Sequence, residues 1–275
     1  MVPDRQHTIA VPMTLSGVGL HTGRVVRMTV WPAPADTGIV FRRTDVPGLP
    51  VRAALDAVAG TAGCVALGDG AGVRTVEHLL SAAWALGVDN CTVEVEGPEL
   101  PGLDGSAAPF ARALRGAGVQ ALGAPRRTLM VRTPVWVRDG DAWAVALPAA
   151  RFSAAYVVTL APPGPGDQAA TYDPLRDVYE ETIAPARTWG YERDAAAMHE
   201  RGMALGATLD NTLVVGGTGF LNAPRFANEA PRHKLLDLLG DLALLGCDIG
   251  ATVVVVRGGH RLHVALARAI QGQEG

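Results

Sequence analysis

The chain has 275 residues, of which 48% are hydrophobic and 19% are charged, and its formal net charge is −3 at pH 7. This composition supplies enough apolar side chains for a buried core and excludes an intrinsically disordered chain, while the charge gives no electrostatic basis for binding nucleic acid. The length fits one large domain or two smaller ones.

In chain order, residues 8–62 contain short apolar or alternating runs separated by turns. These runs predict strands over 8–15, 25–31, 38–41 and 51–54. Thr75 fits the N-cap of a helix over 76–85 that Gly87 ends. A strand over 91–96, a loop over 97–105 rich in Gly and Pro, and a helix over 107–115 follow.

Residues 116–127 form a candidate linker, after which a second series of elements begins. Strands are expected over 128–137, 142–147, 152–160, 211–215 and 252–257, and helices over 195–200, 231–245 and 262–270. Strands grouped before helices, without strict alternation, favour an α+β fold over a doubly wound parallel sheet.

The two halves share an order of elements. In each half a helix is followed by a short sequence ending in glycine (ALG at 85–87, LLG at 244–246), then by a strand and a second helix. Superposing Gly87 on Gly246 lays His78 over Asp237. Identities are few, so the sequence leaves open both an internal duplication and a chance similarity. A duplication would make the two helices pack as equivalents, with their polar residues meeting between the domains.

Three cysteines without a CxxC spacing, Cys64, Cys91 and Cys247, are typical of reduced thiols in a cytoplasmic protein. The N-terminal residues carry no apolar signal segment, and the apolar runs are too short to span a bilayer. We therefore expect a cytoplasmic monomer that binds no nucleic acid and makes at most peripheral contact with a membrane.

His233, Asp237 and Asp241 recur at every fourth position of the expected helix over 231–245, so they share one helix face. Leucines at 235, 236, 238, 239 and 242 surround these polar residues on the helix. An imidazole and two carboxylates among leucines are costly unless something, such as a metal ion, compensates them. Lys234 is the only lysine of the chain, against 23 arginines, which indicates a functional place for a compact ammonium.

A catalytic zinc ion usually has three protein ligands and one open position. His233 and Asp237 supply two ligands, and His78 is the best source of the third. Glu77, beside His78, would then act as the general base toward water. Considered alone, Glu77 and His78 are typical of a surface carboxylate and a core histidine. The polar residues at 233, 237 and 241 favour a metal site instead. Fe²⁺ suits the same ligands.

His260 follows Gly258 and Gly259 at the end of an expected strand. An imidazole there can act as general acid, and Asp241 is the natural group to orient it and keep it protonated. Thr188 could donate a hydrogen bond to a developing oxyanion. Taken alone, His260 reads as an exposed turn residue and Thr188 as a structural loop residue.

Together these motifs resemble the zinc-dependent UDP-3-O-acyl-N-acetylglucosamine deacetylase family, which carries out the committed step of lipid A biosynthesis. The matching segments run in the family's order over nearly the whole chain. They are SGVGLHTG (16–23), TVEHLLSA (75–82), VDN (88–90), LDGSAAPF (103–110), ARTWGY (186–191), LGATLDN (205–211), RHKLLDLLGD (232–241) and GGH (258–260).

The resemblance implies two α+β domains of similar topology, 1–122 and 123–275, that face each other across the active site, with an acyl-passage insert around 186–216. It implies a zinc amidase acting on an acylated nucleotide sugar. The residues that match the family's metal ligands are His78, His233 and Asp237. The catalytic matches are Glu77, His260, Asp241 and Thr188, and the substrate contacts are Lys234, Trp189, Tyr191 and Leu20.

Some positions depart from the family's pattern. Ala142 stands where a lysine is usual, and Thr159-Leu160 where an Asp-Phe pair contacts the sugar and the uracil. Glu192 and Ala207 alter the expected acyl passage. Two alternatives therefore accompany the family's reaction. One is deacetylation of another N-acetylhexosamine conjugate that lacks UDP or the long acyl chain, and the other is a non-catalytic metal-binding regulatory protein on the same fold.

Overall fold

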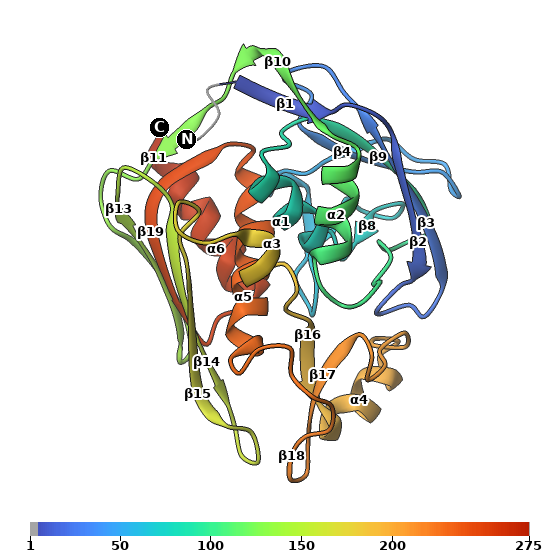
Figure 1. Cartoon of the computed structure of the whole chain (residues 1–275), viewed down its shortest axis with the longest axis vertical. Coiled ribbons are helices and arrows are strands. Elements are labelled where there is room, and N and C mark those ends of the chain that lie inside the picture. The colour runs from blue at the N-terminus through green and yellow to red at the C-terminus, as the bar shows by residue number, and fades with distance from the viewer. Residues whose placement is uncertain (1–4, 275) are drawn as a thin grey trace.

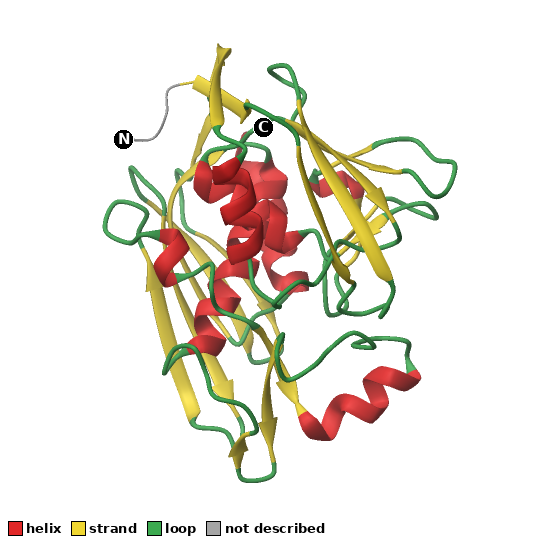
Figure 2. Ribbon diagram, turned by 45° about the vertical axis from the view of Figure 1, so that its right-hand side comes forward, coloured by secondary structure: helices red, strands yellow, loops and turns green. Residues whose placement is uncertain are grey.

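Two β-sheets stand on opposite sides of the molecule, with the main helices between them (Figure 1). The computed structural model describes residues 5–274, and all the statements below concern that part of the chain. Figure 2 shows the same three layers from a second direction. The α+β class expected from the grouping of strands and helices is therefore confirmed.

The first sheet is built from the N-terminal part of the chain. Along β3 alternate residues are buried, so Val26, Met28 and Val30 face the helices. In spatial order its strands are β2 (Met13–Val18), β3 (Val25–Pro32), β9 (Cys91–Glu96), β4 (Ile39–Arg43) and β5 (Val51–Arg52). All its neighbours are antiparallel except β9 and β4, which are parallel.

The second sheet repeats this arrangement with later residues. Its path runs through β12 (Val135–Asp139), β13 (Ala142–Pro148), β19 (Asp248–Val256), β14 (Ser153–Leu160) and β15 (Gly166–Tyr172). Again only one pair on the path, β19 and β14, is parallel. A short strand, β11 (Thr128–Met130), also pairs with β19. The two halves therefore share one topology, strand for strand.

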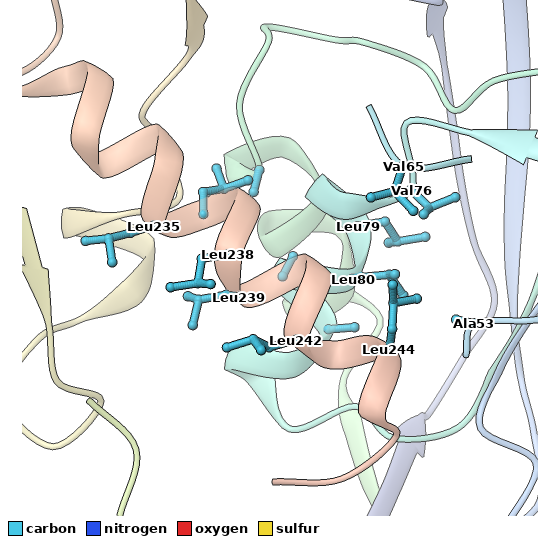
Figure 3. Close-up of a cluster of buried hydrophobic side chains, with 14 of the residues drawn as sticks. Ala53, Val65, Val76, Leu79, Leu80, Leu235, Leu238, Leu239, Leu242 and Leu244 are labelled. Atoms are coloured by element: carbon cyan, nitrogen blue, oxygen red, sulfur yellow. The ribbon is translucent and has the colours of Figure 1, made fainter. Parts of the chain in front are cut away.

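Equivalent helices follow equivalent strands. α1 (Glu77–Leu86) and α2 (Ala108–Gly116) flank β9, as α5 (Glu229–Leu242) and α6 (His260–Gln271) flank β19. Gly87 and Gly246 both adopt the left-handed conformation that ends a helix, with φ of 72° and 66°. α1 packs against α5, as a duplication requires, and buried leucines of both helices lie to the sides of this pair (Figure 3).

Smaller elements surround this framework. β1 (Arg5–Ile9) pairs with β10 (Val119–Pro125), and β6 (Val58–Gly60), β7 (Ala66–Leu67) and β8 (Val73–Arg74) form a three-stranded sheet. Residues 179–220 contribute α3 (Tyr179–Thr182), β16 (Thr188–Tyr191), α4 (Ala195–Glu200), β17 (Thr212–Gly216) and β18 (Gly219–Phe220). Single 3₁₀ turns cover Leu55–Ala57, Glu192–Asp194, Ala243–Leu245 and Gly272–Glu274.

Several expected elements were wrong in detail. The expected strands over 8–15 and 128–137 are each divided into two, at Pro12 and at Pro134, because proline cannot donate to a strand ladder. The expected linker over 116–127 contains β10, and β15 was not anticipated. β10 crosses residue 122, where the domain boundary was expected. That boundary stays a prediction. None of the helices within 5–274 is long and apolar enough to cross a membrane.

Candidate metal centre and active site

Three buried side chains from two helices offer ligand atoms to one point. His78 comes from α1, and His233 and Asp237 from adjacent turns of α5. Their ligand atoms all lie within 4.8 Å of one another. Asp237 Oδ1 is 3.3 Å from His233 Nε2 and 3.8 Å from His78 Nε2. These distances leave room for an ion between the three atoms.

The hydrogen bonds around this group suit a divalent cation. His233 Nδ1 lies 3.0 Å from the carbonyl oxygen of Ala186, so Nδ1 carries the hydrogen and Nε2 keeps its lone pair. Asp237 Oδ1 is buried and has no hydrogen-bond partner within the described residues. A buried carboxylate oxygen facing two imidazole nitrogens without a proton between them is the donor set that zinc prefers.

The protonation states agree with this assignment. Burial is the largest cause that lowers the pKa of His78 to about 3, and burial also lowers the pKa of His233. Both imidazoles are therefore neutral, as a metal ligand must be. Burial opposes the ionisation of Asp237, but positively charged groups around it, among them the ammonium of Lys234, outweigh burial and hold its pKa well below the usual range.

Glu77 is the first residue of α1 and is almost completely buried. Its Oε2 accepts a hydrogen bond from the Val65 N–H at 3.1 Å, and its Oε1 lies 3.7 Å from His260 Nε2. Burial raises the pKa of Glu77 to about 8, while the charge of His260 opposes that rise. A carboxylate tuned close to neutral pH is suited to accept a proton.

His260 and Asp241 form a second buried pair beside these three candidate ligands. His260 Nδ1 is 2.8 Å from Asp241 Oδ2, and His260 Nε2 is 3.9 Å from Asp237 Oδ2. Burial opposes the positive charge of His260, but the carboxylates of Asp241 and Asp237 outweigh it and raise its pKa to about 10. His260 is thus a cationic acid that points Nε2 into the site. It begins α6, so its expected place in a loop was wrong.

Lys234 contacts Asp237 from the side of solvent. Its Nζ donates to Asp237 Oδ2 at 2.8 Å, and its side chain is 20% exposed. Burial opposes its charge, but Asp237 outweighs burial and raises the pKa of Lys234. The one lysine of the chain therefore stays cationic at the edge of the site.

The local backbone explains how the two helices bring these groups together. Gly240 lies so close to α1 that a Cβ placed on it would be 2.1 Å from the Glu77 carbonyl oxygen. Thr75 was expected to cap α1, but the N-cap residue is Val76 and no side chain caps the helix. Thr75 instead has a φ of 57° and donates its hydroxyl to Glu99 Oε1 at 3.1 Å. This strained turn directs Glu77 and His78 inward.

The other expected site residues lie on the loops and strands around this centre. Thr188 begins β16, two residues after Ala186, and its N–H donates to the Gly105 carbonyl oxygen at 2.8 Å. The Trp189 and Tyr191 rings pack edge to face at 6.0 Å, and the Tyr191 hydroxyl accepts the N–H of Ala161. Leu20 is buried, and its carbonyl oxygen accepts the N–H of Gly206. Their contacts with substrate stay predictions.

The positions that depart from the family's pattern fall in different environments. Leu160 is fully buried in the core, and Thr159 Oγ1 accepts from Arg257 at 2.9 Å on the open face of the second sheet. Glu192 is exposed at the start of a 3₁₀ turn, and Ala207 is part of a turn closed by the Ala204 carbonyl oxygen. Ala142 is the first residue of β13.

Sequence reasoning missed two members of the site. His263 was not among the expected site residues, yet it is fully buried and its Nδ1 lies 2.7 Å from Asp241 Oδ2. Its position one turn after His260 on a helix was the signal that could have found it. Arg187 is also buried, and it pairs with Glu229 at 3.0 Å, which ties β16 to the start of α5. No spacing in the sequence predicts the ion pair between Arg187 and Glu229.

Comparisons with known proteins agree with this geometry. The chain matches the family model described as UDP-3-O-acyl N-acetylglycosamine deacetylase over residues 6–272. It is 42% identical over 276 residues to the UDP-3-O-acyl-N-acetylglucosamine deacetylase of Thermosynechococcus vestitus, covering 99% of this chain and 96% of that protein. The protein of the same name from Anaeromyxobacter dehalogenans is 42% identical, covering 98% and 88%. That from Leptospira biflexa is 36% identical, covering 97% and 89%.

Proposed function

The chain belongs to the UDP-3-O-acyl N-acetylglycosamine deacetylase family, and we propose that it hydrolyses the N-acetyl group of UDP-3-O-acyl-N-acetylglucosamine at the site formed by α1, α5 and α6. This reaction is a step of lipid A biosynthesis. The observation that carries the proposal is the convergence of three buried ligand atoms with a buried carboxylate and a cationic imidazole beside them. A purely structural metal needs neither of these two groups.

His78, His233 and Asp237 would hold the metal, which we propose to be zinc. The orphaned Asp237 Oδ1 and the neutral imidazoles fit it, and Fe²⁺ fits the same donors. When bound, zinc acts as a Lewis acid that activates water and polarises the amide carbonyl. Lys234 supports this arrangement, because its ammonium occupies Asp237 Oδ2 and leaves Oδ1 free to bind.

Glu77 and His260 divide the proton transfers. Glu77 takes a proton from the attacking water. Burial raises the pKa of this carboxyl group to about 8, and a hydrogen bond from the Val65 N–H fixes its position. The water oxygen bonds to the amide carbon, and Thr188 would donate a hydrogen bond to the resulting oxyanion. His260 then gives a proton to the departing nitrogen, so the carbon–nitrogen bond breaks into acetate and a free amine.

The test is acetate release by the zinc-loaded protein. The acylated UDP sugar is compared with an analogue lacking the 3-O-acyl chain and with one lacking UDP, with and without prior removal of metal by a chelator. We expect activity that depends on metal. The departures at Ala142, Thr159 and Leu160 predict a weaker preference for the complete substrate than is usual in the family, and a preference of about 10³ or more would refute that weaker dependence and leave the plain family reaction. Equal rates on the UDP-free analogue would favour another N-acetylhexosamine conjugate. Absence of acetate from all three would favour a non-catalytic protein.

The cytoplasmic location and the monomeric state expected from the sequence stay predictions, as do the roles assigned to Leu20, Trp189 and Tyr191. We propose that these three residues line the approach of the substrate. Trp189 supports this role, because its Nε1 is buried and unpartnered within the described residues, which leaves a donor for a bound molecule.

A further inference from the structure

Asp241 serves two imidazoles and not one. His260 Nδ1 is 2.8 Å from Asp241 Oδ2, and His263 Nδ1 is 2.7 Å from the same oxygen. The two histidines are three residues apart on α6, so their rings lie on the same face of the helix and meet edge to face at 6.0 Å. The other oxygen of Asp241 has no hydrogen-bond partner within the described residues. Every bond that orients this carboxylate therefore passes through Oδ2.

Tyr156 holds His263 from the opposite side. The Tyr156 hydroxyl is 2.8 Å from His263 Nε2, and the two rings are perpendicular at 5.6 Å. Both side chains are fully buried. Gly258 makes room for this contact, because a Cβ on Gly258 would lie 2.9 Å from the Tyr156 hydroxyl oxygen.

The directions of these bonds follow from the chemistry of each group. A carboxylate only accepts, so His263 donates from Nδ1. Burial lowers the pKa of His263 and raises that of Tyr156, so the imidazole is neutral and the phenol keeps its proton. His263 Nε2 is then an acceptor, and Tyr156 donates to it. The hydroxyl of Tyr156 thus selects the tautomer of His263 that can donate to Asp241.

We propose that His263, held by Tyr156, is a positioning residue for the deacetylase reaction: it fixes Asp241 Oδ2 so that His260 keeps Nε2 directed at Glu77 and Asp237. This inference rests on the proposed function of the site. With His263 in place, rotation of the Asp241 carboxylate would break two bonds and not one. Without it, His260 would be the only group holding the carboxylate that in turn orients His260.

The same three ligand atoms, from Asp241, His260 and His263, lie close enough to hold a metal ion. However, both Nδ1 atoms already face the single oxygen Oδ2 at hydrogen-bond distance, and His263 Nε2 is occupied by Tyr156. A hydrogen-bonded network accounts for every one of these contacts, so we assign the group to positioning.

The experiment compares four variants by steady-state kinetics on the acylated UDP sugar. His263→Leu removes the donor to Asp241, and we expect kcat to fall by about 10–100-fold with KM within about twofold. His263→Asn retains an amide N–H near the place of Nδ1 that can still donate to Asp241, although its shorter side chain loses the contact with Tyr156, and we expect it to recover most of kcat. Tyr156→Phe should lower kcat by about 3–10-fold, less than His263→Leu.

Tyr179→Phe is the matched control. Tyr179 is also a buried tyrosine with one side-chain hydrogen bond, to Ser81 Oγ at 2.8 Å, but it lies outside the network of Asp241. We expect its kcat to stay within about twofold of the parent, although it loses a buried hydrogen bond of similar energy. A kcat for His263→Leu equal to the parent's, or an equal loss in Tyr179→Phe, would overturn the proposal.

A second measurement needs neither substrate nor activity. Nitrogen-15 NMR of the histidine rings in the zinc-loaded parent should show His263 protonated at Nδ1 and unprotonated at Nε2. The ring signals of His260 should move in Tyr156→Phe and stay in place in Tyr179→Phe. A His263 protonated at Nε2 would refute the proposal even if the parent released no acetate, so its failure is distinguishable from failure of the proposed function. If His263→Leu does not fold, the kinetics of His263→Asn and Tyr156→Phe still test the proposal.

Discussion

Replacing Gly240 by alanine should open the contact that assembles the site. The added methyl would lie 2.1 Å from the Glu77 carbonyl oxygen, and real Cβ contacts are essentially never under 3.0 Å. The obstacle is backbone of α1 and cannot rotate away, so α1 and α5 must separate by about 1 Å. Overpacking of this size costs about 1–3 kcal/mol. Because His78 and Asp237 lie on the two helices, the same shift spreads the ligand atoms, and a misplacement of about 1 Å costs about 10²-fold in activity.

Thermal unfolding, zinc content and acetate release measure these effects in one preparation. We expect Tm to fall by about 2–12 °C, since 1 kcal/mol corresponds to about 2–4 °C in a chain of this size, and kcat/KM to fall by about 10². Gly116→Ala is the control, because Gly116 is also helical and a Cβ there meets nothing within 4 Å. Parent-like Tm and activity in Gly240→Ala would refute the argument from helix approach.

Glu77→Gln should lower turnover by about 10²–10⁴ with zinc content unchanged, because only the proton acceptor is removed; loss of zinc would make Glu77 a ligand or its support. Lys234→Arg should lower kcat/KM several-fold at unchanged Tm, because a planar guanidinium replaces a compact ammonium 2.8 Å from Asp237; parent-like kinetics would contradict this. As the proposed acid, His260 can act only while protonated, so we expect activity to be lost as pH rises through its pKa of about 10. Asp241→Asn removes the charge that opposes burial, so the alkaline limb of the kcat–pH profile should move to lower pH, and an unmoved limb would exclude His260 as the acid.

The polar face of α5 could be predicted from the sequence because its residues lie close together along the chain. His233, Asp237 and Asp241 need only the helix period to align, and the leucines around them predict that the face is buried. His78 and Glu77 could be joined to that face only by the chemistry that a third ligand requires. The structure places all of them together, which the periodicity of either helix alone does not determine.

Other parts of the site depend on contacts between distant segments, for which the sequence holds no period. The role of Gly240 depends on how near the Glu77 carbonyl oxygen comes, and that distance is set by the packing of two helices. Tyr156 meets His263 only because β14 pairs in parallel with β19, the strand that leads into α6. The positive φ of Thr75 likewise accompanies a hydrogen bond to Glu99, which is distant in sequence, and not a helix cap.

The shared topology of the two halves explains why the proposed metal ligands meet where they do. Superposing Gly87 on Gly246 pairs His78 with Asp237, and it also pairs Ser81 with Gly240. Ser81 and Gly240 are both small and buried, and each lies one helical turn after a ligand. Small residues at equivalent positions allow α1 and α5 to approach closely, and the residues one turn earlier are then brought to a common point. The ligand group is therefore a consequence of how equivalent helices pack, and neither half contains it alone.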